Sequence, residues 1–307
     1  GVRHTMAASG NFAFNNPVFQ EDQRRPGLTP PAAPTNYSAA SHQAADLAAS
    51  AQLEGMYAAP TASSANTGRM TVEDTVVKTA GLFGILLVTA LVGWFWTLGG
   101  SLMPTQVEPA DLTIMPWIIG ALVGFVLALV ISFTSRKKVR PALVWAYAAA
   151  EGLFVGGISA YFEFIWPGVV LQATIATLVV VGVTLALFAS GKVRVSKKAN
   201  KIFMIAMVSY LVFGLVNLVL MWTGVTQGTF GLYSQEVFGI PLGLIIGLLV
   251  VLMASYSLVQ DFDLVQQGAR NGAPREFGWI GAFGIMVTVV WLYVEILRII
   301  AILRGND

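Results

Sequence analysis

Residues 279–303 read WIGAFGIMVTVVWLYVEILRIIAIL, a long apolar run in which only Glu295 and Arg298 are charged. A helix needs about 20 mostly apolar residues to cross the hydrocarbon core of a bilayer, and this run is long enough. Backbone groups that face lipid must be hydrogen-bonded within their own segment, which favours a helix. The run therefore predicts a transmembrane helix.

Six further runs of similar length and character precede this one. They do not alternate between polar and apolar residues, as the strands of a membrane β-barrel would. We therefore predict an all-α integral membrane protein with seven transmembrane helices. The first six are expected at 77–98, 114–134, 141–162, 168–189, 201–223 and 239–260.

Composition narrows the class of protein further. Apolar residues make up 56% of the chain and charged residues 11%, whereas soluble proteins carry about 25% charged residues. The chain has no cysteine, which excludes disulfides and thiolate chemistry, and both histidines, His4 and His42, precede the first apolar run. The motifs HExxH and GxSxG and the YD and GxGD pair of intramembrane proteases are missing. We expect no enzyme activity, no cofactor and no nucleic-acid partner; the expected partner is the lipid bilayer.

The first 72 residues differ from the rest. They are rich in Ala, Ser, Asn, Pro and Gln, as in PGLTPPAAPTNYSAASHQAA at 26–45, and show no sustained apolar period. Such a segment cannot bury enough apolar surface to offset the entropy lost on ordering its backbone. We predict two parts, a disordered cytoplasmic N-terminal tail at 1–72 and a seven-helix transmembrane domain at 73–307.

Basic residues lie in alternate connectors. The connector after the second run reads SRKKVR (135–140), and the one after the fourth reads GKVRVSKKANK (191–201). The connectors after the first, third and fifth runs contain no Lys or Arg. Because basic connectors stay in the cytoplasm, we predict a multi-pass membrane protein with its N-terminus cytoplasmic. The absence of cysteine fits a bacterial inner membrane. Seven crossings place the C-terminus outside, although Arg298 and Arg304 run against the rule there.

Besides Glu163, which we expect to meet water at the end of the third run, four carboxyl residues lie within or at the end of these runs. Such residues are costly in lipid, so each is a functional candidate. Glu151, in the third run, either lines an ion path or is a hydrogen-bonded structural carboxyl. Asp261 and Asp263 point to different sides of a helix; we favour Asp261 as the one that faces the bundle and Asp263 as a solvated helix end. Glu295 is either functional or forms a structural ion pair with Arg298, three residues later.

Three of these stretches together resemble a known family. They are RPALVWAYAAAEGLFVGGISAYFE (140–163), YSLVQDFDLVQQG (256–268) and WLYVEILRIIAIL (291–303). In their order and spacing, and in the seven apolar runs, the chain resembles the Bax inhibitor-1 family, in its bacterial YccA-like branch. The resemblance covers roughly 77–304 and leaves the tail out. It implies a central seventh helix wrapped by the other six.

The resemblance also implies a function and a site. Bacterial members of the family are implicated in a pH-sensitive calcium leak that depends on a carboxylate at the end of the sixth helix and another in the seventh. Matched by motif, these fall on Asp261 in DFDLV and on Glu295 in LYVEI, as gating residues and candidate calcium ligands. Here Glu replaces Asp at the second position. The family's latching arginine of the second helix aligns near Thr134, with Arg136 the nearest candidate.

Two functions remain open from the sequence. Two neighbouring carboxyls in a low dielectric cannot both ionise easily, so they would titrate as a coupled pair and gate a pH-sensitive calcium leak. Asp261 and Glu295 would carry the gate, with Glu151, Asp263 and Arg136 as candidate path-lining or latching residues. The alternative is a regulatory, cytoprotective membrane protein that binds other membrane proteins, such as a membrane protease.

Overall fold

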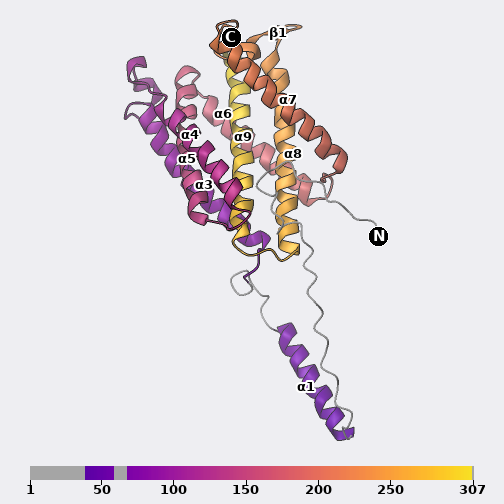
Figure 1. The fold of residues 1–307 in the computed structure, drawn as a ribbon. Helices are drawn as coiled ribbons and strands as arrows, with labels where there is room; N and C mark the ends of the chain where they lie inside the picture. The colour runs from indigo at the N-terminus through magenta and orange to yellow at the C-terminus, as the bar shows by residue number, and fades with distance from the viewer. Residues whose placement is uncertain (1–38, 59–67, 306–307) are drawn as a thin grey trace.

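The computed structural model describes residues 39–58 and 68–305, and the spanning helices in it follow the predicted runs (Figure 1). Seven described helices are long and apolar enough to cross a membrane, so the predicted fold class is confirmed. They are α3 (Val72–Thr97), α4 (Met115–Thr134), α5 (Pro141–Ile165), α6 (Val169–Ala189), α7 (Lys197–Trp222), α8 (Leu242–Arg270) and α9 (Phe277–Gly305).

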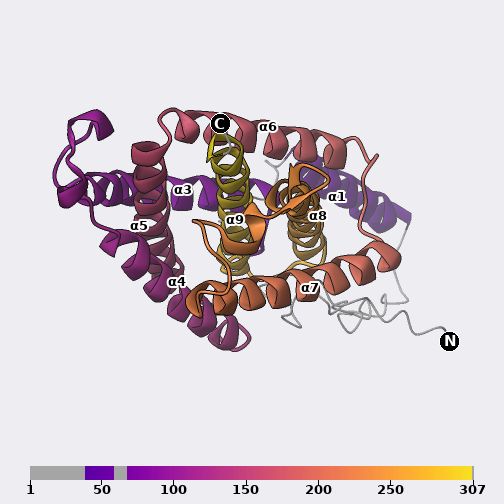
Figure 2. The same ribbon diagram turned by 90° about the horizontal axis from the view of Figure 1, so that it is seen from above.

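Helix α9 lies at the centre of the bundle, and α3, α5, α6 and α8 pack against it (Figure 2). In the most apolar window of α9, 56% of the residues are buried inside the protein, compared with 11% for α7. The predicted central position of the seventh helix is therefore confirmed. Helix α7 is the least covered of the spanning helices and contacts mainly α8 and the loop that follows α7.

Glycines at four-residue spacing allow the helices to approach closely. Gly152 and Gly156 of α5 face α3, and a Cβ added to Gly152 would collide with the backbone of Leu86. Gly243 and Gly247 of α8 lie against side chains of α9 in the same way. In lipid, such small residues favour helix association because they let backbones come together.

The connections at the C-terminal end of α9 contain short elements. The connection between α3 and α4 holds two 3₁₀ turns, and the connection between α7 and α8 holds a third turn and a small hairpin (Figure 1). The elements are η3 (Pro104–Gln106), η4 (Pro109–Asp111), η5 (Gly231–Ser234), β1 (Glu236–Val237) and β2 (Ile240–Pro241).

The predicted tail contains one described helix, α1 (Ala39–Ala58). Its sequence is rich in alanine, which has the highest helix propensity, and residues 46–55 are all exposed. The prediction of a disordered tail at 1–72 did not include this helix. The rest of that tail up to residue 67, and residues 306–307, lie outside the described residues.

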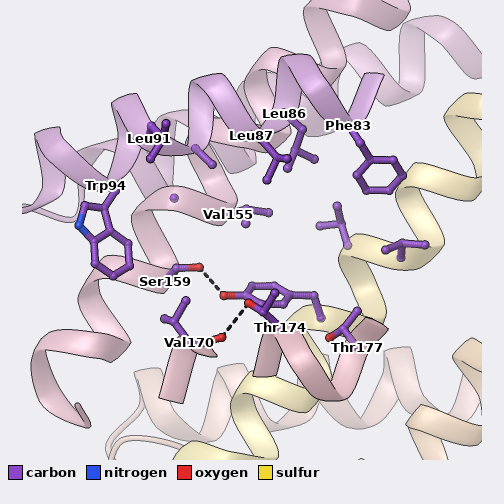
Figure 3. A pocket seen from close by; sticks show the side chains of 15 residues that line it. Phe83, Leu86, Leu87, Leu91, Trp94, Val155, Ser159, Val170, Thr174 and Thr177 are labelled. Carbon is purple, nitrogen blue, oxygen red and sulfur yellow. Dashed lines mark hydrogen bonds between the residues drawn. The ribbon is translucent and has the colours of Figure 1, made fainter. Parts of the chain in front are cut away.

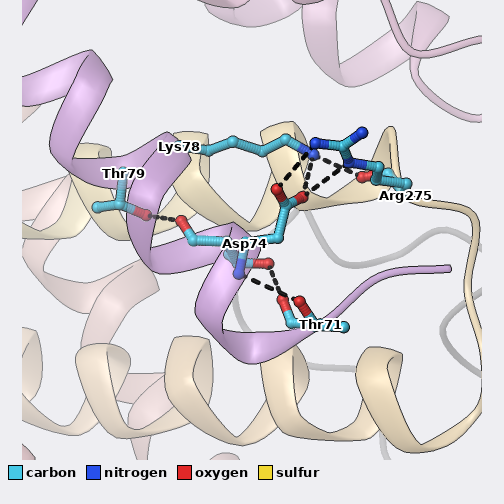
Figure 4. A network of polar contacts seen from close by, with 6 residues as sticks. Thr71, Asp74, Lys78, Thr79 and Arg275 are labelled. Atoms are coloured by element: carbon cyan, nitrogen blue, oxygen red, sulfur yellow. Dashed lines mark hydrogen bonds and ion pairs between the residues drawn. The ribbon is translucent and has the colours of Figure 1, made fainter. Parts of the chain in front are cut away.

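A cluster of charged residues fastens the start of α3 to the turn between α8 and α9 (Figure 4). The Asp74 carboxylate lies 2.7 Å from Lys78 Nζ and 3.3 Å from Arg275 Nη2. Lys78 Nζ also donates to the carbonyl of Arg275 at 2.7 Å. Thr71 begins the helix, because its hydroxyl accepts from the Asp74 N–H at 3.1 Å. We call Asp74, Lys78 and Arg275 the Asp74 clamp.

Candidate functional site

The buried carboxyl of Asp261 lies between α8 and α9. The side chain is fully buried, and its Oδ2 accepts a hydrogen bond from Thr288 Oγ1 at 2.5 Å. The same hydroxyl lies 3.1 Å from the carbonyl of Gly284 and 3.5 Å from the hydroxyl of Ser257. A hydroxyl has one hydrogen, so Thr288 donates either to an ionised Asp261 or, when Asp261 is protonated and donates to it, to Gly284. The protonation state of Asp261 therefore decides which bond Thr288 makes.

The second buried carboxyl, Glu295, lies between α9 and α7. It is 2% exposed and accepts hydrogen bonds from the phenol of Tyr210 and from the guanidinium of Arg298. Arg298 Nη2 also donates to the Tyr210 oxygen at 3.0 Å, and its guanidinium carbon lies 4.3 Å from the ring centre of Tyr233. We call Tyr210, Glu295 and Arg298 the Glu295 triad. It holds an ion pair and ties α7 to the central helix.

Polar contacts also hold the two ends of α7. Near its start, Gln260 Nε2 of α8 donates to Asn200 Oδ1 at 2.8 Å, and the hydroxyl of Tyr256 donates to the same oxygen. Near its end, Asn217 Oδ1 accepts from the N–H of Leu232 at 2.7 Å. With the Glu295 triad, α7 therefore has three polar ties to the rest of the bundle.

These ties matter because α7 has little other packing. Helix association in lipid has no hydrophobic driving force, so its strength comes from close packing and polar contacts. A cavity of about 640 Å³ separates α7 from α8, and Phe203, Tyr210 and Phe213 of α7 line it together with Val250 and Tyr256 of α8. Among the spanning helices, α7 is therefore the one that the fewest contacts hold in place.

Asp261 and Glu295 lie at different levels along α9. Thr288, the partner of Asp261, precedes Glu295 by seven residues, which is about 10 Å along a helix axis. Asp261 accepts a hydrogen bond from the hydroxyl of Thr288, whereas Glu295 accepts hydrogen bonds from Tyr210 and Arg298. Both carboxyls thus lie in one seam between α7, α8 and α9, but these contacts give each its own partners. We call this region the α7–α9 seam.

Asp263 lies near the seam but outside its buried part. Helix α8 continues past it to Arg270, so Asp261 and Asp263 point to different sides of the same helix. Asp263 is half-buried, and its Oδ2 accepts from Gln267 Nε2 at 2.6 Å, one helical turn later.

Glu151 and Arg136 share a different cavity. It has a volume of about 540 Å³ and is lined mainly by α4 and α5, which lie across α9 from α8 (Figure 2). Arg136 is exposed just after the end of α4, while Glu151 is half-buried in the middle of α5. The structure thus places the nearest candidate for the latching arginine in the same cavity as Glu151, and the cation that pairs with Glu295 is Arg298.

A third cavity, of about 410 Å³, lies between α3, α5, α6 and α9 (Figure 3). Its walls are apolar except for a few hydroxyls. Ser159 and Tyr293 form a hydrogen bond of 2.6 Å across it, and Thr174 donates to the carbonyl of Val170 at 2.7 Å. Glu163, at the end of α5, accepts from the backbone N–H groups of Gly168 and Val170 and so caps the start of α6.

Comparison with known proteins gives the family. A family model described as Bax inhibitor 1 like matches residues 16–305, which is nearly the whole chain. The chain belongs to the Bax inhibitor 1-like family. No curated protein matches it. The family match and the seven spanning helices together support a multi-pass membrane protein of the Bax inhibitor 1-like family.

Two residues of the site were missed from the sequence. Tyr210 lies in the apolar run MIAMVSYLVFG (204–214), and Thr288 lies in the seventh run. A hydroxyl within an apolar span was the available signal. Ser and Thr hydroxyls usually bond to the carbonyl four residues earlier, as Ser209 does here, and a tyrosine hydroxyl does not reveal its partner in the sequence. Only the packing of this Bax inhibitor 1-like bundle distinguishes the two that reach a carboxyl.

The carboxylates of the described part of the chain occur singly and do not form a site with several ligands for one metal ion. Within residues 39–58 and 68–305, no three His, Cys, Asp or Glu side chains come together in a way that would hold a metal. Calcium prefers six to eight oxygen ligands. Asp261 and Glu295 are therefore separate, single carboxylates in this Bax inhibitor 1-like protein.

Proposed function

We propose that this protein is a pH-sensitive cation leak of an inner membrane, with calcium as the permeant ion and the α7–α9 seam as its gate. The observation that carries the proposal is the Glu295 triad, in which a buried ion pair ties the least packed spanning helix to the central one. A buried ion pair is sensitive to protonation, because neutralising one partner leaves the other without its counter-charge.

Acid opens the proposed gate. At neutral pH the ionised Glu295 binds both Tyr210 and Arg298. Protonation of Glu295 removes its attraction for Arg298, and α7 then keeps only its ties at Asn200 and Asn217. Helix α7 moves away from α9, and the neighbouring cavity between α7 and α8 joins the seam.

Asp261 is the second carboxyl on the proposed cation path, after Glu295. It lies about two helical turns from Glu295 on the side of the bundle where the Asp74 clamp lies. When it is ionised, its carboxylate offers oxygen ligands of the kind that calcium prefers. When it is protonated, it donates to the Thr288 hydroxyl, which then donates to the carbonyl of Gly284 within α9, and the charged ligand is lost. Asp261 thus adds its own pH dependence to that of Glu295.

Calcium flux into proteoliposomes, scanned from acid to neutral pH, tests this proposal. Glu295→Gln mimics the protonated gate, so we expect it to raise flux at neutral pH and flatten the pH profile. Asp261→Asn removes the charged ligand and is expected to lower calcium flux where Asp261 is ionised, and to have less effect in acid, where the wild-type carboxyl is already neutral. Glu108→Gln, which removes an exposed carboxyl between α3 and α4, is the matched control and should behave as wild type.

Two results would contradict the leak. One is a pH profile that neither substitution changes. The other is flux no greater than that of protein-free liposomes at any pH, which would favour a regulatory protein that binds other membrane proteins.

We also propose that the N-terminus and the connectors 135–140 and 191–201 lie in the cytoplasm, because these connectors carry the basic residues. The absence of native cysteine allows a direct test with single cysteines. In intact cells, an impermeant maleimide should label Glu108→Cys and leave Lys138→Cys unlabelled until the cells are lysed. Labelling of Lys138→Cys in intact cells would reverse the orientation.

A further inference from the structure

The cavity between α4 and α5 contains an acidic group that forms no ion pair with the described part of the chain. Glu151 lies ten residues after the start of α5 and fourteen before its end. At 1.5 Å per residue it is therefore about 15 Å from one end of the helix and about 21 Å from the other. The hydrocarbon core is about 30 Å thick, so this carboxyl lies near its middle.

Glu151 has no cationic partner among the residues that the structure describes. The ion pairs there join Asp74 to Lys78 and Arg275, and Glu295 to Arg298. The one side chain that interacts with Glu151 is Tyr147, one turn earlier on the same helix. An unpaired carboxylate at this depth is costly, so a cation from outside the protein would gain strongly by binding to it.

The backbone around Glu151 leaves room for its carboxylate. A Cβ added to Gly124 of α4 would lie 3.1 Å from Glu151 Oε1, closer than an ordinary contact, so glycine is what lets the carboxylate occupy this position. The same side chain lines the cavity of about 540 Å³. That volume falls within the range of about 300–1,000 Å³ that is usual for ligand sites, where a few polar groups fix the ligand in an apolar pocket.

The walls of the cavity indicate which kind of cation fits. They are mainly apolar and aromatic, and Phe125, Phe133, Phe154 and Tyr147 contribute rings. Aromatic rings attract organic cations through their π faces. A small inorganic cation needs several oxygen ligands, and the side chains here offer little beyond the carboxylate and the hydroxyls of Tyr147 and Ser132.

The residues that line the cavity also indicate how a ligand would enter it. Phe125 and Phe133 are largely exposed on the surface of α4, where they face the lipid. Arg136 lines the cavity just beyond the end of α4, where its charge opposes cations that approach from the water. A ligand that carries its charge on an apolar body can instead arrive through the bilayer.

We propose that the cavity between α4 and α5 is a binding site for a lipophilic organic cation, with Glu151 as its counter-ion. The charged and titratable groups that line the cavity with Glu151 are Tyr147 on its own helix and Arg136 just after α4, while α9 contributes Val287. Protons compete with the ligand for the carboxylate, so acid weakens binding.

Equilibrium binding of tetraphenylphosphonium to the full-length protein in lipid nanodiscs tests this site. We expect Glu151→Gln to weaken binding at least about tenfold, which corresponds to about 1.4 kcal/mol. Tetraphenylmethane, a neutral molecule of the same shape, should bind wild type and Glu151→Gln equally. Glu108→Gln is the control for loss of a carboxyl elsewhere, and Arg136→Gln should bind the cation at least as tightly as wild type.

Wild-type protein alone gives a second measurement that does not depend on a substituted protein folding. Tetraphenylphosphonium affinity should fall as the pH is lowered, whereas the affinity for neutral tetraphenylmethane should stay constant. Equal affinity of wild type and Glu151→Gln for the cation, or cation binding that does not change with pH, would overturn the proposal. Binding no greater than that of empty nanodiscs would overturn it as well.

Discussion

The hydroxyl of Tyr210 donates to the carboxylate of Glu295, and this contact joins the least buried spanning helix, α7, to the most buried one, α9. Arg298 completes the contact by binding both groups. Because α7 has few other contacts, the strength of this one hydrogen-bonded group should determine how far α7 can move.

Tyr210→Phe removes the phenolic hydroxyl and keeps the ring. We expect it to lower the free energy of unfolding by about 1 kcal/mol, since hydrogen bonds between membrane helices average about 0.6 kcal/mol and bonds to charged groups are worth more. Thermal unfolding in detergent measures this change. Tyr161→Phe is the matched control, because the hydroxyl of Tyr161 forms no hydrogen bond within the described part of the chain. Equal losses in the two variants would mean that Tyr210 does not tie α7 to α9.

Glu295 and Arg298 should be energetically coupled. Removing one partner of a buried ion pair leaves an uncompensated charge and costs about 3–5 kcal/mol, whereas replacing both is often nearly neutral. We therefore expect Arg298→Met to be strongly destabilising and the double variant Glu295→Gln, Arg298→Met to be less so. Unfolding free energies of the wild type, both single variants and the double variant give the coupling as a double-mutant cycle. Additive losses would show that the pair is not coupled.

Thr288 should be needed for its hydroxyl and not for its shape. Thr288→Val keeps the volume and removes the donor to the buried Asp261, which should cost about 1–3 kcal/mol. Thr288→Ser keeps the hydroxyl and should cost about 1 kcal/mol or less, the value of one buried methyl group. Chemical unfolding of the two variants compares them. A larger loss in the serine variant would mean that packing of the methyl group outweighs the bond to Asp261.

The hydropathy of the sequence was sufficient to predict the seven spans, because lipid demands long apolar runs. It did not predict where every helix ends. Helix α8 was expected to end near residue 260 but continues to Arg270, through QDFDLVQQGAR. Apolar length reports on lipid contact, and a polar helix that leaves the bilayer gives no such signal.

The site was harder to predict than the spans. The sequence identified Asp261 and Glu295 as candidates because carboxyls are rare in lipid, and both side chains are buried in the structure. Their offset by two turns was not predictable, since the level of one helix against another depends on the turn between them and on packing. Arg298 was visible as a neighbour of Glu295 in sequence, but Tyr210 comes from a helix 85 residues away.

The stabilising effect of the Asp74 clamp should come mainly from the ion pair between Asp74 and the buried Lys78, and less from the pair between Asp74 and Arg275. Lys78 is 8% exposed, whereas Arg275 is 46% exposed. Exposed ion pairs contribute at most about 1 kcal/mol, and buried charges that lose their partner cost more. We therefore expect Asp74→Asn to destabilise the protein more than Arg275→Gln, and the effect of Arg275→Gln to disappear at high salt. Thermal unfolding at low and high salt checks both expectations, and a greater loss in Arg275→Gln would contradict them.

Close packing of α5 on α3 gives a prediction with an internal control. A Cβ at position 152 would lie 2.4 Å from the carbonyl oxygen of Leu86, and backbone cannot move aside as a flexible side chain can. We expect Gly152→Ala to lower the free energy of unfolding by about 1–3 kcal/mol, the usual cost of overpacking.

Gly182 of α6 has nothing within 4 Å of the position of an added Cβ. The gain in helix propensity from glycine to alanine is up to about 1 kcal/mol, so Gly182→Ala should be neutral or stabilising. Unfolding of the two alanine variants in the same detergent therefore separates the effect of packing from that of propensity. If Gly152→Ala were as stable as Gly182→Ala, α3 and α5 would have to lie further apart than this fold places them.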